Sequence, residues 1–286
     1  MILRDTIQKA SLILKKNYIG THSLDAEVIL SNIMKVKREF LLLNEEIEVS
    51  KEVIKKYNRA LKRRLKKEPV AYILGKKEFW STDFTVNKSA LIPRPETELL
   101  VDKVVELFKH KRINILDIGT GCGCILLSIL KELNLSKGIG IDISMKAVEL
   151  AKKNSKKLKL LNKVSFKVCD INNFCFGKYD LIVSNPPYIP NKDLRSLSKE
   201  ITNYEPLMAL NGGIDGLDLV RKVIYKSKKL LKKSGILAIE IGNNQYKKVS
   251  NILKHNDFRE ISKVTDSGCN VRCIISAIWF FFRIIR

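Results

Sequence analysis

The sequence predicts an α/β protein in which a small helical bundle precedes a mostly parallel, doubly wound sheet with helices on both faces. Three observations support this fold class. Residues 1 to about 70 follow a helical period, and Gly20 is the only glycine or proline before Pro69. Beyond residue 95, strand and helix patterns alternate as they do in βαβ units. A glycine-rich turn directly follows one of these strands, and 286 residues are enough for two unequal domains.

The first part of the chain predicts several amphipathic helices. Ile7, Ala10 and Leu14 share one helical face, and Ser23 is the predicted N-cap of a second helix. A further helix is predicted over residues 52–67 and ends in the basic run LKRRLKK. We therefore expect residues 1–78 to form an N-terminal helical domain.

The pattern changes at Phe79, where the chain continues as FWSTDFTVNKSALIPRP. Phe84 and Val86 alternate with polar residues, and turn-forming residues follow them, which predicts a hairpin or an extended linker over residues 79–95. The second domain is then expected over residues 96–286.

Strand and helix segments alternate through this second domain. Helices are expected at 146–154 and 217–231. Strands are predicted at 113–117, 138–142, 164–168, 179–184 and 236–241. The tail CIISAIWFFFRIIR is too short to cross a bilayer and predicts a last strand with a hydrophobic extension, with an interfacial anchor as the alternative.

Composition narrows the function classes. The chain has 53 Lys and Arg against 30 Asp and Glu, a net charge of +23, which suits either a nucleic-acid partner or a generally lysine-rich composition. Six cysteines form no CxxC pair and the three histidines are isolated, so neither a zinc site nor a His-dependent nucleophilic relay is expected. With no leader peptide or membrane span predicted, we expect a cytoplasmic protein with reduced thiols.

The glycine-rich turn predicts a nucleoside-cofactor site. The strand that ends at Asp117 runs into Ile-Gly-Thr-Gly-Cys-Gly, where missing side chains let backbone amides approach a ligand. Asp142 ends the next strand 19 positions after Gly123, the spacing at which a carboxylate reaches a ribose diol.

A second motif predicts chemistry at a planar NH2 group. Asn185, Pro186, Pro187 and Tyr188 follow the strand at 179–184, at the ligand-binding edge of such sheets. An amide or exocyclic amine is a poor nucleophile because its lone pair is delocalised. Asn185 Oδ1 and the Pro186 carbonyl can accept both N–H hydrogens while Tyr188 packs on the group. DNA adenine, ribosomal RNA guanine and protein glutamine are all acceptors compatible with this motif.

The pattern D-x-G-x-G-x-G resembles motif I of class I S-adenosylmethionine-dependent methyltransferases, which have a Rossmann-like, seven-stranded, mostly parallel sheet. The resemblance implies that Asp142 binds the ribose, that Asp170 lies near the adenine amino group with Ile171 as an apolar contact, and that Asn185 also borders the cofactor. The motif turn that would hold the cofactor consists of Gly119, Thr120, Gly121, Cys122 and Gly123. A helix N-cap or turn role is the alternative for Asp170.

Further blocks resemble the PrmC/HemK family of protein-(glutamine-N5) methyltransferases. They are EPVAYILG from Glu68, PRPETE from Pro93, NPPY from Asn185, YEP from Tyr204, the Gly212 to Leu217 loop, EIG from Glu240 and DSGCNVR from Asp266. The resemblance implies methyl transfer to the glutamine of the Gly-Gly-Gln motif in class I peptide-chain release factors.

The same resemblance implies S-adenosylhomocysteine as product, no metal, no membrane, no required nucleic-acid binding and a monomer. It assigns catalysis to Asn185, Pro186 and Tyr188, substrate contact to the whole motif from Asn185 to Tyr188, and recognition of the release factor to the helical domain. Two alternatives remain: a DNA or ribosomal RNA exocyclic-amine methyltransferase that uses the same motif, and a non-catalytic module that keeps the cofactor fold as a scaffold.

Overall fold

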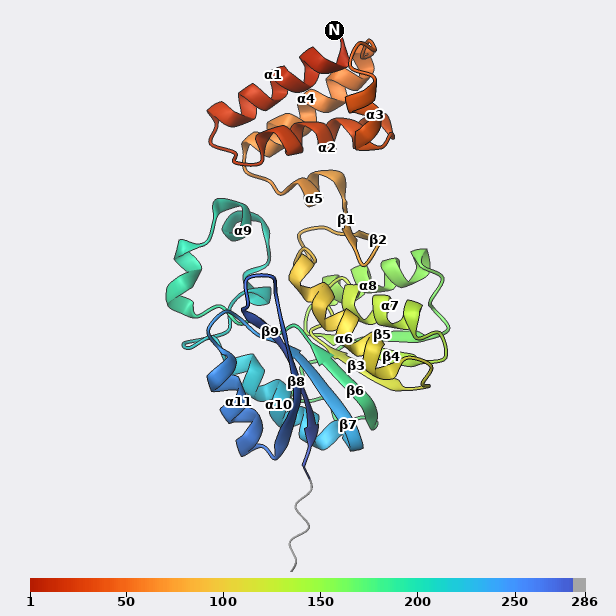
Figure 1. Ribbon diagram of the computed structural model, residues 1–286, viewed down its shortest axis with the longest axis vertical. Helices are drawn as coiled ribbons and strands as arrows, with labels where there is room; N and C mark the ends of the chain where they lie inside the picture. Colours follow the sequence, from red (N-terminus) through yellow and green to blue (C-terminus); the bar gives the residue numbers. More distant parts are fainter. Residues whose placement is uncertain (280–286) are drawn as a thin grey trace, which may run out of the picture. The chain divides into compact units, whose positions relative to one another are not determined.

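The computed structural model describes residues 1–279, and the chain divides into two compact units (Figure 1). The first unit contains Met1–Lys76 and Ser198–Tyr204, and the second contains Lys77–Leu197 and the chain from Glu205 onward. One short segment inside the second half of the sequence therefore belongs to the N-terminal unit. Within residues 1–279, no helix has both the length and the apolar composition needed to cross a membrane.

The first unit is helical, as the sequence predicts. Its helices surround an apolar core in which Leu3, Leu14, Ile29, Leu30 and Tyr57 are almost fully buried. The helices are α1 (Leu3–Lys16), α2 (His22–Met34), α3 (Arg38–Leu43), α4 (Lys51–Leu65), α5 (Val70–Leu74) and α9 (Lys199–Tyr204).

The start of α2 differs from the prediction that Ser23 is its N-cap. The helix begins at His22 with Thr21 at the cap position, and no side chain caps it. Thr21 donates its hydroxyl to Asp25 instead, at 2.9 Å, and the helix begins two residues earlier than predicted. Ser23 lies inside the helix and donates to Glu27.

A buried arginine holds the first unit together. Arg64, on α4, has 2 % of its surface exposed. Its guanidinium donates to Asp25 on α2 at 2.6 Å and to Glu200 on α9, also at 2.6 Å. Burial of this charge is offset by two carboxylates and by the Glu68 carbonyl, which accepts a third hydrogen bond. Through these hydrogen bonds, Arg64 joins α9, which contains Glu200, to α2 and α4 near the start of the chain.

The second unit opens with a hairpin and an extended stretch, and the hairpin begins at Lys76, three residues before the predicted start at 79. Strands β1 (Lys76–Phe79) and β2 (Thr82–Thr85) form a two-stranded sheet, and Trp80 and Ser81 turn between them with φ of 50° each. The chain then runs extended to the short 3₁₀ helix η1 (Pro95–Thr97).

A seven-stranded sheet forms the centre of the second unit, which confirms the predicted fold class. Its strand order is β5-β4-β3-β6-β7-β9-β8. The first five strands in this order are parallel, and β9 runs antiparallel to both β7 and β8. The strands are β3 (Asn114–Ile118), β4 (Lys137–Asp142), β5 (Val164–Val168), β6 (Tyr179–Ser184), β7 (Leu231–Glu240), β8 (Phe258–Thr265) and β9 (Val271–Ile278).

Helices cover both faces of the sheet (Figure 1). Apolar residues of α6 (Glu98–Phe108), α7 (Cys124–Glu132) and α8 (Met145–Lys157) pack with one face. Those of α10 (Asp218–Leu230) and α11 (Tyr246–His255) pack with the other. The tail forms the predicted last strand β9 as far as Ile278, whereas its proposed extension or anchor at 280–286 lies outside the described residues.

Candidate functional site

A cavity of about 480 Å³ lies at the carboxyl ends of β3, β4, β5 and β6. Because these strands are parallel, the residues that follow each of them meet at this edge. The predicted site residues that line the cavity are Gly119, Thr120, Gly121, Cys122, Asp142, Asp170, Ile171, Asn185 and Pro187. Gly123, Pro186 and Tyr188 are close in sequence to these residues but are not part of the lining.

The glycine turn after β3 needs its glycines for conformation. Gly119, Gly121 and Gly123 have φ of 75°, 55° and 83°, a region that side chains with a Cβ atom rarely adopt. At Gly123 a Cβ would also lie 3.1 Å from Leu127 and 3.2 Å from Ala151, where α7 packs against α8. The turn therefore combines exposed backbone with close packing of the helix that follows.

Asp117, on β3, forms a hydrogen bond with the glycine turn that follows this strand. Its carboxylate is fully buried and accepts the Thr120 hydroxyl at 2.7 Å. The pKa of Asp117 is raised to about 7, mainly by burial and to a smaller extent by the nearby Asp142 carboxylate, while the Thr120 hydrogen bond opposes the rise.

Asp142 connects the end of β4 to the same turn. One of its oxygens accepts the Gly121 amide at 2.9 Å and the other accepts the Ser144 amide, also at 2.9 Å. Burial raises the pKa of this carboxyl, and the two backbone hydrogen bonds oppose the rise. These bonds fix the carboxylate at the cavity wall, where its remaining lone pairs are available to hydroxyl donors.

Asp170 and Ile171 follow β5. Asp170 accepts the Asn172 amide at 2.7 Å, so it forms the turn that was the alternative reading, and it also lines the cavity. Ile171 is 7 % exposed and belongs to the apolar cluster on the α10 face. Together with Ile143 it gives the cavity an apolar wall next to the carboxylates.

These features suit a nucleoside-type cofactor. A backbone turn with positive φ, a carboxylate fixed at the end of the second strand and apolar side chains for a flat ring lie around one cavity. Within residues 1–279, no group of three or more His, Cys, Asp or Glu side chains is arranged to hold a metal ion.

The loop after β6 brings Asn185 to the cavity. Asn185 donates its Nδ2 to the Thr97 hydroxyl at 3.1 Å, and Thr97 belongs to η1, which is 88 positions earlier in the chain. Pro186 is buried. The amide plane of Asn185 is thereby held from one side, which leaves its Oδ1 for another partner.

Tyr188 is fixed by both its backbone and its ring. Its carbonyl accepts Gln245 Nε2 at 2.9 Å, and a Cβ at Gly216 would lie 2.4 Å from the same carbonyl. Its hydroxyl donates to Glu240 Oε1 at 3.4 Å. Burial, with Glu240 nearby, raises the pKa of Tyr188 well above its usual value, so the phenol stays protonated and serves as a donor.

Sequence analysis missed several residues of this site. Thr97 and Glu240 contact the motif side chains, and a buried Glu205 accepts Arg94 at 2.7 Å and the Ile92 amide at 3.2 Å. All of these except Ile92 lie in blocks that the sequence offers only as family resemblance. Their roles depend on contacts across 52 to 113 positions, for which spacing carries no signal.

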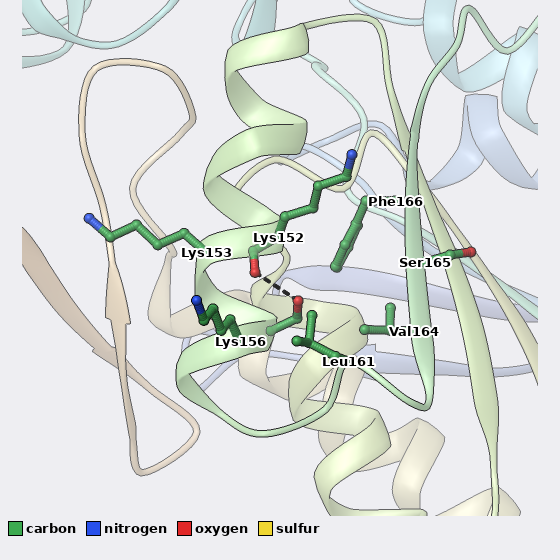
Figure 2. Close-up of a pocket in the computed structure, with 8 residues that line it drawn as sticks. Lys152, Lys153, Lys156, Leu161, Val164, Ser165 and Phe166 are labelled. Atoms are coloured by element: carbon green, nitrogen blue, oxygen red, sulfur yellow. Dashed lines mark hydrogen bonds between the residues drawn. The ribbon is translucent and has the colours of Figure 1, made fainter.

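A second cavity, of about 540 Å³, lies between α8 and the edge strand β5 (Figure 2). Lys152, Lys153 and Lys156 project from α8 around an apolar floor that includes Leu161 and Phe166. None of the predicted site residues lines it. The predicted motif residues lie instead around the cavity at the carboxyl ends of the strands.

The fold and the cavity define a class I S-adenosylmethionine-dependent methyltransferase. Residues 109–274 match a methyltransferase domain family, and residues 5–75 match the PrmC N-terminal domain. The chain belongs to the release factor glutamine methyltransferase family, which confirms the resemblance found in the sequence.

Several relatives carry that name, including the proteins of two bacteria. The protein of Fusobacterium nucleatum is 41% identical over 280 residues, which cover 95% of this chain and 78% of the relative. That of Clostridium acetobutylicum is 38% identical over 282 residues, which cover 96% of this chain and 98% of the relative. The solved structure of a T. thermophilus 16S rRNA N2 G1207 methyltransferase with AdoMet and guanosine has a TM-score of 0.52 at 15% identity, covers 71% of this chain and 50% of that chain, and supports the fold alone.

Proposed function

We propose that this enzyme transfers a methyl group from S-adenosylmethionine to the side-chain amide nitrogen of the glutamine in the Gly-Gly-Gln motif of class I peptide-chain release factors. The observation that carries the proposal is the Asn185 to Tyr188 loop, whose amide and aromatic side chains are held next to the cofactor cavity. Membership of the release factor glutamine methyltransferase family supports the choice of acceptor.

The chain's own residues position the acceptor. Asn185 Oδ1 and the Pro186 carbonyl accept the two hydrogens of the glutamine NH2 group, and the Tyr188 ring packs against its plane. Two prolines restrict the loop, so these acceptors are oriented before the substrate arrives. The nitrogen lone pair then points out of the amide plane, towards the cavity.

S-adenosylmethionine, when bound, supplies an electrophilic methyl group with a neutral thioether as its leaving group. The glutamine nitrogen forms the new N–C bond with its lone pair while the C–S bond breaks and its electron pair stays on sulfur, giving S-adenosylhomocysteine. The nitrogen then releases one proton. In this proposal the protein contributes orientation and exclusion of water, and no covalent enzyme intermediate is needed.

The cofactor is held in this proposal by the residues around the cavity. Asp142 accepts the ribose hydroxyls, the turn from Gly119 to Gly123 faces the methionine and ribose, and Asp170 with Ile171 borders the adenine. In this proposal the N-terminal helical domain at 1–78 recognises the release factor, and the linker at 79–95 connects it to the catalytic domain at 96–286. We further propose that the enzyme acts as a cytoplasmic monomer.

A nucleic-acid acceptor is the second candidate, because the net charge of +23 favours a polyanion and the same loop can hold an exocyclic amine. A competition experiment separates the two. With methyl-labelled cofactor, an unmethylated release factor, ribosomal RNA and adenine-containing DNA are offered together at equal concentration. We expect label in the release factor alone. Label in either nucleic acid, with the release factor unlabelled, would contradict the proposal and identify a nucleic-acid acceptor.

A further inference from the structure

Asn185 can serve the proposed function in only one of its two amide orientations. Oδ1 must face the substrate, because the substrate NH2 group offers hydrogens and needs acceptors. If the side-chain amide turned over, Nδ2 would face the substrate and two donors would meet. Some neighbour must therefore discriminate between the oxygen and the nitrogen of Asn185.

Thr97 is that neighbour, but a hydroxyl alone does not discriminate. It accepts Asn185 Nδ2 at 3.1 Å, and its side chain is almost fully buried at 2 % exposure. A hydroxyl has one hydrogen and two lone pairs, so it can equally donate to an amide oxygen. It becomes a strict acceptor towards Asn185 only if its own hydrogen is engaged elsewhere.

Glu240 is placed to engage that hydrogen. It is the last residue of β7, the strand next to β6, and the pairing of Ser184 with Ile239 places it one position further along, level with Asn185. Its side chain is 2 % exposed, and its Oε1 accepts the Tyr188 hydroxyl at 3.4 Å. Its Oε2 is buried without a hydrogen bond of ordinary geometry within residues 1–279.

The Thr97 hydroxyl is a donor close to this carboxylate, but no hydrogen bond of ordinary length and angle joins it to Glu240 Oε2. Burial raises the pKa of Glu240 to about 7, and the Thr97 hydroxyl is the largest influence that lowers it, ahead of Tyr188 and Arg272. A donor that stabilises the ionised form directs its hydrogen to the carboxylate. The Thr97 hydrogen is then unavailable to Asn185.

We propose that Glu240 is a positioning residue for methyl transfer: by accepting the Thr97 hydroxyl hydrogen, it makes Thr97 an acceptor for Asn185 Nδ2 and so directs Asn185 Oδ1 at the substrate amide. This inference rests on the proposed function of Asn185. Glu240 acts through Thr97 and touches neither substrate nor cofactor. Its second oxygen holds the Tyr188 hydroxyl, so one carboxylate orients both side chains of the loop.

Only the ionised form of Glu240 can do this. A protonated carboxyl can donate its hydrogen to Thr97 Oγ1, which frees the Thr97 hydrogen for Asn185 Oδ1 and permits the amide to turn over. The orienting effect therefore increases as pH rises through about 7. The other groups that face Glu240 are Glu96 beside Thr97, Tyr188 on the loop, and Arg272 and Cys273 on β9; Arg94 acts on Tyr188.

The test compares Thr97→Val, Thr97→Ser and Glu240→Gln with the wild-type enzyme, using a whole release factor as substrate and saturating cofactor. We expect Thr97→Val to lower kcat by about tenfold to a hundredfold, the scale of a misplaced reacting group. Thr97→Ser keeps the hydroxyl, so its kcat should be close to that of the wild type. Wild type and Thr97→Ser should show one rise in kcat with pH near neutrality, which Thr97→Val and Glu240→Gln should lack.

Controls separate this inference from the function on which it rests. Ser227→Ala deletes another buried hydroxyl, on α10, and should leave kcat and its pH profile unchanged. Cofactor affinity and the midpoint of thermal unfolding verify that each variant is folded. If Glu240→Gln does not fold, the kcat values and pH profiles of Thr97→Val and Thr97→Ser still test the proposal. An inactive Asn185→Ala together with a fully active, pH-responsive Thr97→Val would overturn the role of Glu240 alone. An active Asn185→Ala would overturn the proposed function itself.

Discussion

At the scale of single residues, Asn185 separates methyl transfer from cofactor binding. It donates to Thr97 and is proposed to accept from the substrate, whereas the turn after β3 and Asp142 are proposed to hold the cofactor. We expect Asn185→Ala to reduce transfer by at least about a hundredfold, because the acceptor is no longer oriented. Calorimetry should show nearly unchanged cofactor affinity. A parallel loss of affinity and transfer would contradict this role.

Asp142 is expected to have the opposite signature. Its replacement by alanine removes charge-assisted hydrogen bonds worth about 1.5 to 3 kcal/mol, which corresponds to about tenfold to a hundredfold weaker cofactor binding. Asp102→Ala, which removes an exposed carboxylate on α6, is the matched control. Equal cofactor affinity in both variants, measured by calorimetry, would refute the ribose assignment.

Residue spacing predicted the parts of the site that lie next to each other in sequence. Asn185 and Tyr188 share one loop, and Asp142 lies 19 positions after Gly123, so their patterns are visible in the chain. Thr97 and Glu240 were missed because their roles exist only where η1, β6 and β7 meet. In the sequence alone, no local pattern distinguishes Thr97 from the other threonines of the chain.

At the scale of elements, Arg64 is expected to carry much of the stability of the helical unit. Arg64→Met leaves Asp25 buried without its partner, which costs about 3 to 5 kcal/mol in the free energy of unfolding. Lys56→Met breaks an exposed pair with Glu52 on the same helix and should leave the free energy of unfolding nearly unchanged. Urea unfolding of the whole chain measures both, and equal losses would show that the buried network is not stabilising.

Strand bounds were predicted correctly for β5 and β6, at 164–168 and 179–184, although β5 lies at the edge of the sheet. β7 begins at Leu231, five residues before the predicted start, since its pairing with β6 continues past an irregularity opposite Tyr179. β8 was not predicted separately, because Phe258 is its only buried residue and the pattern is weak.

At the scale of the whole molecule, buried acids set part of the pH dependence of stability. The pKa of Glu240 rises from 4.5 to about 7 on folding because the side chain is buried. Between these values the folded state keeps a proton that the unfolded state has lost, so stability from this group is complete below pH 4.5 and is lost as pH rises through about 7. Asp117 acts in the same direction.

Glu240→Gln provides the measurement. The variant cannot ionise at this position, so the free energy of unfolding of the wild type, relative to the variant, should fall as pH increases from about 5 to 8. Denaturant unfolding at four or five pH values gives this difference directly. A difference that is constant with pH would show that Glu240 does not titrate in this range.

The change from helical to alternating patterns predicts two parts of the chain, and the structure divides into two units with other bounds, since 198–204 belongs to the first unit. Glu200 contacts Arg64, 136 positions away, and the Tyr204 hydroxyl donates to the Lys66 carbonyl. A six-residue helix with no strong pattern gives no sign of such a contact in the sequence.

Mass spectrometry of the Gly-Gly-Gln peptide tests the central claim most directly. A release factor purified without its methylation is incubated with the enzyme and S-adenosylmethionine, then digested, and the glutamine-containing peptide is fragmented; Asn185→Ala is the control. We expect one methyl group on the glutamine side-chain nitrogen, present with the wild type and absent with the variant. An unmodified glutamine, from enzyme that still binds the cofactor, would contradict it.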